Sequence, residues 1–343
     1  MSRFRDTRTR TVPARRRPSR HLRPRPRGAT GFTAALLVSA LATAPGAPAQ
    51  DLGPKLLGGI GIDAGVQPEP GLYLIDRVVR YDADQLRDRN GNLVPIRGLD
   101  IDVIANGLGL SLTLKPENWP YLSFGFGLPL ADVSLNSTDP RVTVDRAGFG
   151  DIFVQPLKVG WRFPDADLVA AYAFYAPTGH FEPRGGGGVG RGFWTHQFSL
   201  GGAGFASRAR QIRASALLSY DLNLRKRDID IRRGNTLQIQ GGAGIRIKRV
   251  FDVGIAGFAL WQVTDDSGSD IPPRLRGARD RVYGLGPEIG VLIPAIRSRL
   301  VLRMEWDLGV RSRPEGRIIV AGLAAALWRP QPPRPPVTRT PRR

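Results

Sequence analysis

The chain has 343 residues, no cysteine, 42 glycines and a formal net charge of +20. The absence of cysteine excludes a disulfide scaffold and any thiolate metal site. Much of the positive charge lies in the two ends of the chain, which are expected to be removed or disordered, and the centre has no recognisable nucleic-acid module, so no nucleic-acid partner is expected.

The first 49 residues have the pattern of a secretory signal peptide with a long basic n-region. An Arg- and Pro-rich stretch leads into a short apolar run, and Ala47 and Ala49 form an A-x-A cleavage site before Gln50. The apolar run is shorter than the roughly 20 residues of a membrane-spanning helix. We therefore predict an exported protein whose mature chain begins near residue 50.

From Gly71 onward the chain divides into runs rich in aliphatic residues, aromatic residues and Gly, which are typical of strands. The predicted strands lie at about residues 71–81, 98–114, 121–136, 148–163, 166–179, 192–207, 211–226, 235–247, 251–265, 281–294, 298–312 and 316–328. Twelve is an even number, as in bacterial outer-membrane barrels made of one chain.

The predicted strand at residues 298–312 alternates strictly between apolar and charged side chains. Its apolar face carries Leu300, Leu302, Met304, Trp306, Leu308 and Val310. Its charged face carries Arg299, Arg303, Glu305, Asp307 and Arg311. A period of two indicates a strand whose faces meet different media. In an outer-membrane barrel the apolar face meets lipid and the charged face lines the lumen.

The connections alternate between short and long, as periplasmic turns and external loops do in outer-membrane barrels. Residues 82–97 and 137–147 are predicted as two of the long external loops. Trp119, Trp161 and Trp328 fall near the predicted periplasmic strand ends, and Trp194 and Trp261 fall near the external ends. Two such aromatic girdles are typical of chains that span a bilayer.

The predicted strand at residues 98–114 departs from this regularity. Asp100 and Asp102 begin on one face, and the alternation then loses its phase near Asn106 and Gly107. A bulge or a glycine kink at this point is expected to account for the change of phase.

Charged side chains of the strands are expected to point into the lumen, because an Arg or Lys that faces lipid at the midplane costs about 2–4 kcal/mol. The candidates for lining the lumen are Asp100, Asp151, Gln155, Asp221, Arg225, Gln262, Glu288, Arg303, Glu305 and Asp307. The wall charges form either a water-filled selectivity lining or a structural salt-bridge network, and the sequence leaves both readings open.

A series of short motifs runs through most of residues 71–328. They are GFGDI at 148–152, QPL at 155–157, YAFYAPTG at 172–179, GFWTHQ at 192–197, SYDLN at 219–223, WQVTDDSG at 261–268, LGPE at 285–288 and RPEG at 313–316. As an ordered set they resemble the outer-membrane transporter family named for the meta-pathway of phenol degradation. The resemblance implies a β-barrel that passes aromatic or other hydrophobic compounds across the outer membrane.

The prediction is a single twelve-stranded antiparallel β-barrel over residues 50–328, in the outer membrane of a Gram-negative bacterium, followed by a disordered Pro/Arg-rich tail at 329–343. The expected partners are outer-membrane lipid, a small-molecule solute and the barrel-assembly machinery. No cofactor, metal ion or catalytic residue is expected.

Two alternatives from other classes stay open, a barrel with a plugged, structural lumen and a phospholipase-like outer-membrane enzyme. A soluble periplasmic β-domain is a further possibility. The enzyme would require a nucleophile beside His196. The alternation places His196 on the outer face with Trp194 and Phe198, whereas Ser219 on the next strand is expected to point into the lumen. His196 is therefore interpreted as a member of the aromatic girdle.

Overall fold

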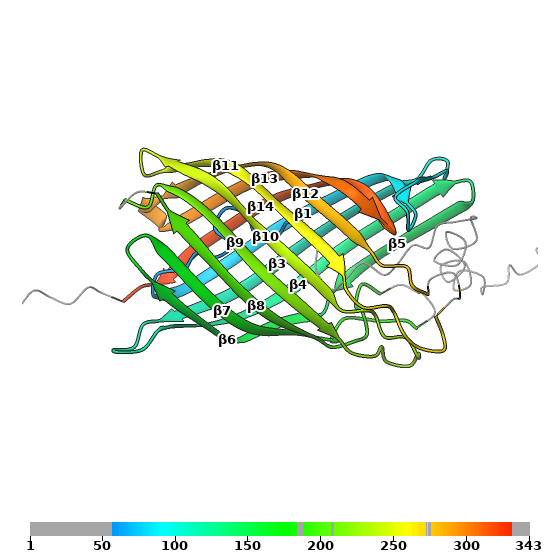
Figure 1. Cartoon of the computed structure of the whole chain (residues 1–343), viewed down its shortest axis with the longest axis horizontal. Helices are drawn as coiled ribbons and strands as arrows, with labels where there is room; N and C mark the ends of the chain where they lie inside the picture. The colour runs from blue at the N-terminus through cyan, green and yellow to red at the C-terminus, as the bar shows by residue number, and fades with distance from the viewer. Residues whose placement is uncertain (1–56, 184–187, 207–208, 272, 274–275, 331–343) are drawn as a thin grey trace, which may run out of the picture.

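The computed structural model describes residues 57–183, 188–206, 209–271, 273 and 276–330 (Figure 1). The predicted signal peptide at residues 1–49 and most of the predicted tail at 329–343 lie outside the described residues. Both assignments therefore stay predictions.

Antiparallel strands form one sheet that closes on itself into a barrel (Figure 1). The wall strands are β1 (Gly71–Arg87), β3 (Asp100–Leu114), β4 (Tyr121–Thr138), β6 (Ile152–Arg162), β7 (Ala166–Ala176), β8 (Thr195–Phe205), β9 (Ile212–Asn223), β10 (Thr236–Ile247), β11 (Phe251–Gln262), β12 (Arg281–Ile293), β13 (Ser298–Arg311) and β14 (Arg313–Trp328). Pairing of β1 with β14 closes the barrel, with Val78 opposite Ala321. The predicted twelve-stranded antiparallel barrel is confirmed.

The smaller elements lie at the ends of the barrel. β2 (Leu93–Val94) pairs with the end of β1, and η2 (Pro294–Ile296) is a 3₁₀ turn between β12 and β13. Within the described part of the chain, no helix is long and apolar enough to cross a membrane. We call the end with the longer connections the loop end and the other the turn end; in outer-membrane barrels these face the exterior and the periplasm.

The prediction of a loop at residues 137–147 is wrong. β5 (Arg141–Phe149) forms a hairpin with β4, with a register that runs from Thr138 opposite Arg141 to Leu130 opposite Phe149. Val142 and Val144 are buried and alternate with exposed residues, which is the pattern of a strand. The wall therefore extends further at the loop end here than the sequence-based boundaries indicate (Figure 1).

The predicted bulge near Asn106 and Gly107 is also absent from β3. The strand pairs with β1 and with β4 in continuous register through both residues. Asp100 and Ile104 are exposed on the same face of β3 as Asn106, whereas Ile101 and Val103 are buried inside. The apparent change of phase arises because this outer face is polar at the loop end and apolar towards the turn end.

The distribution of side chains is the inverse of that in a soluble protein. On the outer face, Leu200 is 63% exposed and Ile255 is 58% exposed, whereas Glu305 and Asp252 on the inner face are 0% exposed. Large exposed apolar residues around a closed barrel form the surface that contacts the lipid. The protein is an outer-membrane β-barrel, as its sequence predicts.

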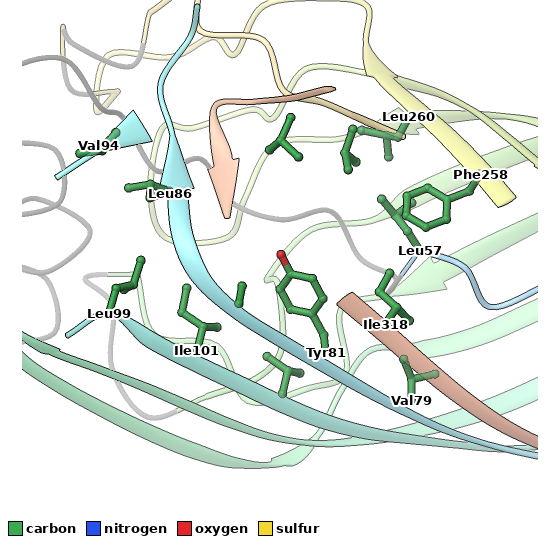
Figure 2. Close-up of a cluster of buried hydrophobic side chains, with 14 of the residues drawn as sticks. Leu57, Val79, Tyr81, Leu86, Val94, Leu99, Ile101, Phe258, Leu260 and Ile318 are labelled. Carbon is green, nitrogen blue, oxygen red and sulfur yellow. The ribbon is translucent and has the colours of Figure 1, made fainter. Parts of the chain in front are cut away.

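The inside of the barrel towards the loop end holds a group of buried hydrophobic residues, which we call the apolar cluster (Figure 2). It consists of Leu57, Val79, Tyr81, Ala83, Leu86, Val94, Leu99, Ile101, Val103, Val142, Val144, Phe258, Leu260, Val282, Val310, Ile318 and Val320. Most of these residues come from β1, β3, β5, β11 and β14. The lumen is thus not uniformly polar along its length.

Candidate functional site: the lumen

Residues 57–70, which precede β1 and which we call the N-terminal segment, lie inside the barrel. The backbone N–H of Ile60 donates to Gln240 Oε1 on β10 at 3.2 Å, and the hydroxyl of Ser215 on β9 donates to the carbonyl oxygen of Ile62 at 2.8 Å. The N–H of Ile62 donates to Glu288 Oε2 on β12 at 3.1 Å. The segment therefore binds side chains on the inner faces of several separate strands.

The other half of the N-terminal segment contacts β6 and β7. The N–H of Gln67 donates to Asp167 Oδ2 at 3.0 Å, and Arg162 donates to the carbonyl oxygen of Gln67 and pairs with Glu69. In the strand order of the sheet, β6 and β7 lie across the barrel from β12 and β13. The segment thus crosses the lumen and obstructs it.

The fit of the segment to the wall is close at Gly61. A Cβ atom built on this glycine would lie 1.6 Å from Glu288 Oε2 and 1.9 Å from Arg303 Nη1. No side chain larger than hydrogen has room at this position unless the wall shifts.

A group of paired charges, which we call the ionic network, surrounds the segment. It consists of Asp63, Arg213, Arg246, Asp252, Glu288, Arg299 and Arg303. Asp252 accepts hydrogen bonds from Arg246 Nε at 2.8 Å and from Arg299 Nε at 3.0 Å. Arg303 Nη1 donates to Glu288 Oε2 at 2.8 Å, and both side chains are almost completely buried. Such buried charges persist only when they are paired.

Asp63 connects the N-terminal segment to this network. Its Oδ1 accepts a hydrogen bond from Arg213 Nε at 2.7 Å, and its other oxygen pairs with Arg299. Both arginines also pair with Asp252, so the carboxylate of the segment shares its partners with a carboxylate of the wall. Charge attraction therefore adds to the backbone hydrogen bonds that hold the segment in the lumen.

Across the lumen from the β1 and β3 part of the apolar cluster, the inner faces of β8, β9 and β10 carry hydrogen-bonded polar residues. Asp221 Oδ1 accepts from Gln197 Nε2 at 2.6 Å, and Asp221 Oδ2 accepts from Thr236 Oγ1 at 3.2 Å. β9 and β10 lie across the barrel from β1 and β3 in the strand order. The lumen towards the loop end is therefore amphipathic, with an apolar side and a polar side.

Two fully buried polar side chains in the lumen make no hydrogen bond to any described residue. Both amide atoms of Gln238 are unpartnered, although the side chain is completely buried and its neighbour in the register on β11 is Leu260 of the apolar cluster. Both carboxylate oxygens of Glu305 are also unpartnered, and its closest charged group is Arg303 Nε at 3.6 Å. Buried polar groups normally have a hydrogen-bond partner, and a water molecule or a polar group of a solute that reached these atoms would supply one.

Most of the ten predicted lumen residues lie inside the barrel. The buried ones on inner faces or at inner strand ends are Asp221, Gln262, Glu288, Arg303, Glu305 and Asp307. Gln155 is half-buried on the inner side of β6 beside Gly125. The structure brings Glu288, Arg303 and Glu305 together in and beside the ionic network.

Asp100 and Arg225 lie elsewhere, which corrects their expected orientation. Asp100 is on the exposed outer face of β3, at the loop end. Arg225 follows β9 in an external connection, where its side chain is 66% exposed and pairs with Asp230 at 2.7 Å. The argument from the cost of burying charge in lipid does not apply at these positions, because they lie beyond the apolar part of the wall.

Asp151 is buried but acts on the backbone and does not line the lumen. It lies between β5 and β6, and its two carboxylate oxygens accept the N–H groups of Gly179 and Arg191, each at 3.0 Å. We expect Asp151→Ala to lower the free energy of unfolding by about 1–3 kcal/mol, because two N–H groups lose their acceptor. The measurement is the urea midpoint of the folded protein. Asp151→Asn should retain part of the stability, and equal midpoints for Asp151→Ala and the wild type would contradict the role.

The N-terminal segment, including Asp63, and the wall residue Asp252 that shares its arginine partners were missed by the sequence analysis. The available signal was a charged residue, Asp63, in a short stretch of glycines and apolar residues immediately before the first strand. Such a stretch has no strand-like alternation and no length that identifies an element.

On the outer face, His196 packs against Tyr172. The Tyr172 hydroxyl and His196 Nδ1 are 2.8 Å apart, and the rings stack with centroids 6.1 Å apart. Ser219 is buried inside, where its hydroxyl lies 2.9 Å from that of Ser199. His196 and Ser219 thus lie on opposite sides of the wall. The described residues also contain no group of three or more His, Cys, Asp or Glu side chains placed to hold a metal ion.

Comparison with known proteins identifies the family. A sequence model described as "Putative MetA-pathway of phenol degradation" matches residues 83–320, which is more than half of the chain. The chain belongs to this family. The phenol-degradation family match spans the barrel from β1 into β14 and includes all ten predicted lumen residues. Among curated proteins, none matches the chain.

Solved structures similar to this member of the phenol-degradation family are outer-membrane barrels. An outer-membrane channel from Pseudomonas putida F1 is 15% identical, with a TM-score of 0.68 over 77% of this chain and 98% of that one. The transport unit of the autotransporter AIDA-I from Escherichia coli is 12% identical, with a TM-score of 0.47 over 88% and 99%. The CymD monoaromatic hydrocarbon channel is 10% identical, with a TM-score of 0.40 over 76% and 89%. The similarity to the Pseudomonas putida channel supports the barrel fold.

Proposed function

We propose that the protein is a channel through which small hydrophobic compounds, in particular aromatic ones, cross the outer membrane, and that it is not an enzyme. The observation that carries this proposal is the amphipathic lumen towards the loop end. Phe258, Leu260 and Ile318 line an apolar side (Figure 2). Asp221 and Gln197 lie on the polar side. Such a lining suits a solute with an apolar ring and a small polar substituent.

The family supports the same class of solute, since it is described by a pathway of phenol degradation. The unpartnered groups of Gln238 and Glu305 offer hydrogen-bond acceptors next to apolar residues of the lumen. A hydroxyl group on an aromatic ring could satisfy one of them as the ring moves past Leu260 or Phe258. The lumen residues are therefore proposed to act as a lining that solutes contact and not as catalytic groups.

The N-terminal segment limits what this lumen can pass. A twelve-stranded barrel is narrower than the 16–18-stranded general porins, and here residues 57–70 occupy part of it. We propose that only small solutes pass while the segment is in place. This obstruction also favours a second candidate, a closed barrel with a structural role.

Solute flux into liposomes that contain the refolded mature chain tests both candidates. Because aromatic compounds also cross bare lipid, the measured quantity is the excess flux over empty liposomes. We expect an excess for phenol-like aromatics and little for sugars of similar size. An equal excess for both solutes would indicate a general narrow porin. The absence of any excess, including for a variant without residues 57–69, would favour the closed barrel.

The absence of an enzymatic role has its own test at His196. We expect His196→Ala to leave solute flux unchanged, because the side chain lies on the outer face and stacks on Tyr172. We also expect neither the wild type nor this variant to hydrolyse phospholipid in detergent micelles. Phospholipid hydrolysis by the wild type that disappears in His196→Ala would overturn this part of the proposal.

A further inference from the structure

A hydrogen-bonded polar pair lies on the outer face of the wall, next to the β1–β14 seam. Asn106 Nδ2 on β3 donates to Asp76 Oδ1 on β1 at 2.6 Å. Both residues share the outward face with Val78, which is 40% exposed, and with Leu108, which is 45% exposed. The register between β1 and β3 is continuous from Gly71 to Ala83, so strand alternation fixes this orientation.

The pair lies within the apolar part of the outer face. On β1, Leu72 and Leu74 precede Asp76 on this face, and Val78 follows it. The next charged residue on the face is Arg80. On β14, the residue opposite Asp76 is Leu323. The neighbouring outward positions of β14 are also apolar, and they are Ile319, Ala321, Ala325 and Leu327.

Hydrocarbon cannot complete the hydrogen bonds of these two side chains. The hydrogen bond between them uses one N–H of the Asn106 carboxamide and one oxygen of the Asp76 carboxylate. A carboxamide has a second N–H and an acceptor oxygen, and a carboxylate has further acceptor sites. Polar and ionisable groups in the membrane are costly and usually mark a site of function or contact.

We infer that a second copy of this chain packs against the outer face of β14, β1 and β3, with Asp76 and Asn106 at the centre of the contact. One residue of the pair donates and the other accepts, so a two-fold axis would place the Asn106 of each copy beside the Asp76 of the other. This complementarity to itself is what an isologous interface requires. The hydrocarbon chains of lipid have no group that could form these hydrogen bonds.

The surface next to the pair allows close approach. Val78 lies between Ala321 on β14 and Asn106 on β3 in the register, and Ala321 is exposed. Small residues let the backbones of membrane-embedded elements come together, and polar side chains then bond across the contact. The face therefore combines a small apolar surface with a central hydrogen-bonding group.

Single-cysteine crosslinking in the outer membrane tests this contact. Because the chain has no native cysteine, the introduced thiol is the only one in each copy. We expect full-length Val78→Cys to form a disulfide-linked dimer on oxidation with iodine. The matched control is Leu218→Cys on β9, across the barrel, where the native side chain is 38% exposed compared with 40% for Val78. The control should stay monomeric.

The polar pair is tested by adding Asp76→Leu and Asn106→Leu to the Val78→Cys chain. Leucine suits a lipid-facing position, so the barrel should fold, as heat-modifiable migration in gels would verify. We expect loss of the crosslinked dimer. Three results would overturn the inference, namely no dimer from Val78→Cys, equal crosslinking of Leu218→Cys, or a dimer that persists in the folded triple variant.

Discussion

Deletion of residues 57–69 is expected to raise the conductance of the barrel severalfold in planar bilayers. The segment crosses the lumen between Gln67, which binds Asp167, and Ile62, which binds Glu288. Its removal leaves a pore bounded only by the wall and its side chains. The flux of small sugars into liposomes should rise as well, because an obstruction is removed from a lumen whose wall carries many polar and charged side chains.

A milder version of the same experiment uses Asp63. Asp63→Asn removes the charge that binds Arg213 and Arg299 but keeps a similar shape. A hydrogen bond to a charged group contributes about 1.5–3 kcal/mol. The position of the segment inside the lumen should lose about that amount of free energy relative to an open state, in which the segment has left the lumen. Because about 1.4 kcal/mol is a tenfold change in an equilibrium constant, open events should become about tenfold or more frequent.

The matched control for both variants changes a charge that lies outside the wall and does not contact the segment. Arg225→Gln alters an exposed external side chain and should leave conductance close to that of the wild type. Conductance of the deletion variant equal to that of the wild type, with the barrel folded, would mean that the N-terminal segment does not limit passage.

The second large effect is expected from Glu288→Leu, which should lower the free energy of unfolding by about 3–5 kcal/mol. The substitution leaves the guanidinium of Arg303 buried without its partner at 2.8 Å. It also removes the acceptor for the N–H of Ile62. The urea concentration at which the folded band disappears from a gel of the unheated protein should fall markedly.

The control for this prediction is the double variant Glu288→Met and Arg303→Met. Replacing both members of a buried pair with apolar residues of similar volume is often neutral or stabilising. The double variant should therefore be clearly more stable than Glu288→Leu alone. If the double variant were the less stable of the two, the pair would contribute to stability in some other way than by compensation of buried charge.

The barrel could be predicted because its signals are local. A strand that separates lipid from water has a period of two, and residues 299–308 display it. The prediction that Val310 continues the apolar outer face is wrong, because Gly309, with a positive φ of 58°, shifts the phase and Val310 is buried inside. The aromatic residues at strand ends and the rhythm of connection lengths indicate the same fold. Each of these patterns lies within a few residues of sequence.

The errors in the predicted strands arose where one face of a strand passes from water into lipid. The outer face of β3 runs from water, at Asp100 and Asp102, into the apolar belt at Leu108. The prediction assigned a single medium to each face of a strand. It therefore interpreted this change as a bulge and placed Asp100 inside the lumen. The hairpin of β4 and β5 was missed for a related reason, since it continues the wall beyond the apolar belt.

The ionic network could be predicted only in part. The charges of β13 were identified from their alternation, and Arg303 and Glu288 do meet. The partners of the N-terminal segment could not be found in this way. Ser215 and Ile62 are 153 positions apart, and Gly58 and Arg303 are 245 apart. Such contacts depend on the closure of the whole sheet, which no local pattern encodes.

The position of residues 57–70 inside a barrel closed by β1 and β14 also constrains the order of biosynthetic events. The segment leaves the ribosome before every strand that later encloses it, and the wall is complete only when β14 pairs with β1. Until that moment the segment is accessible to proteases of the periplasm, and afterwards the wall shields it. The moment at which the segment becomes resistant to limited proteolysis therefore marks the closure of the barrel. Following this resistance over time would measure the rate of assembly in living cells.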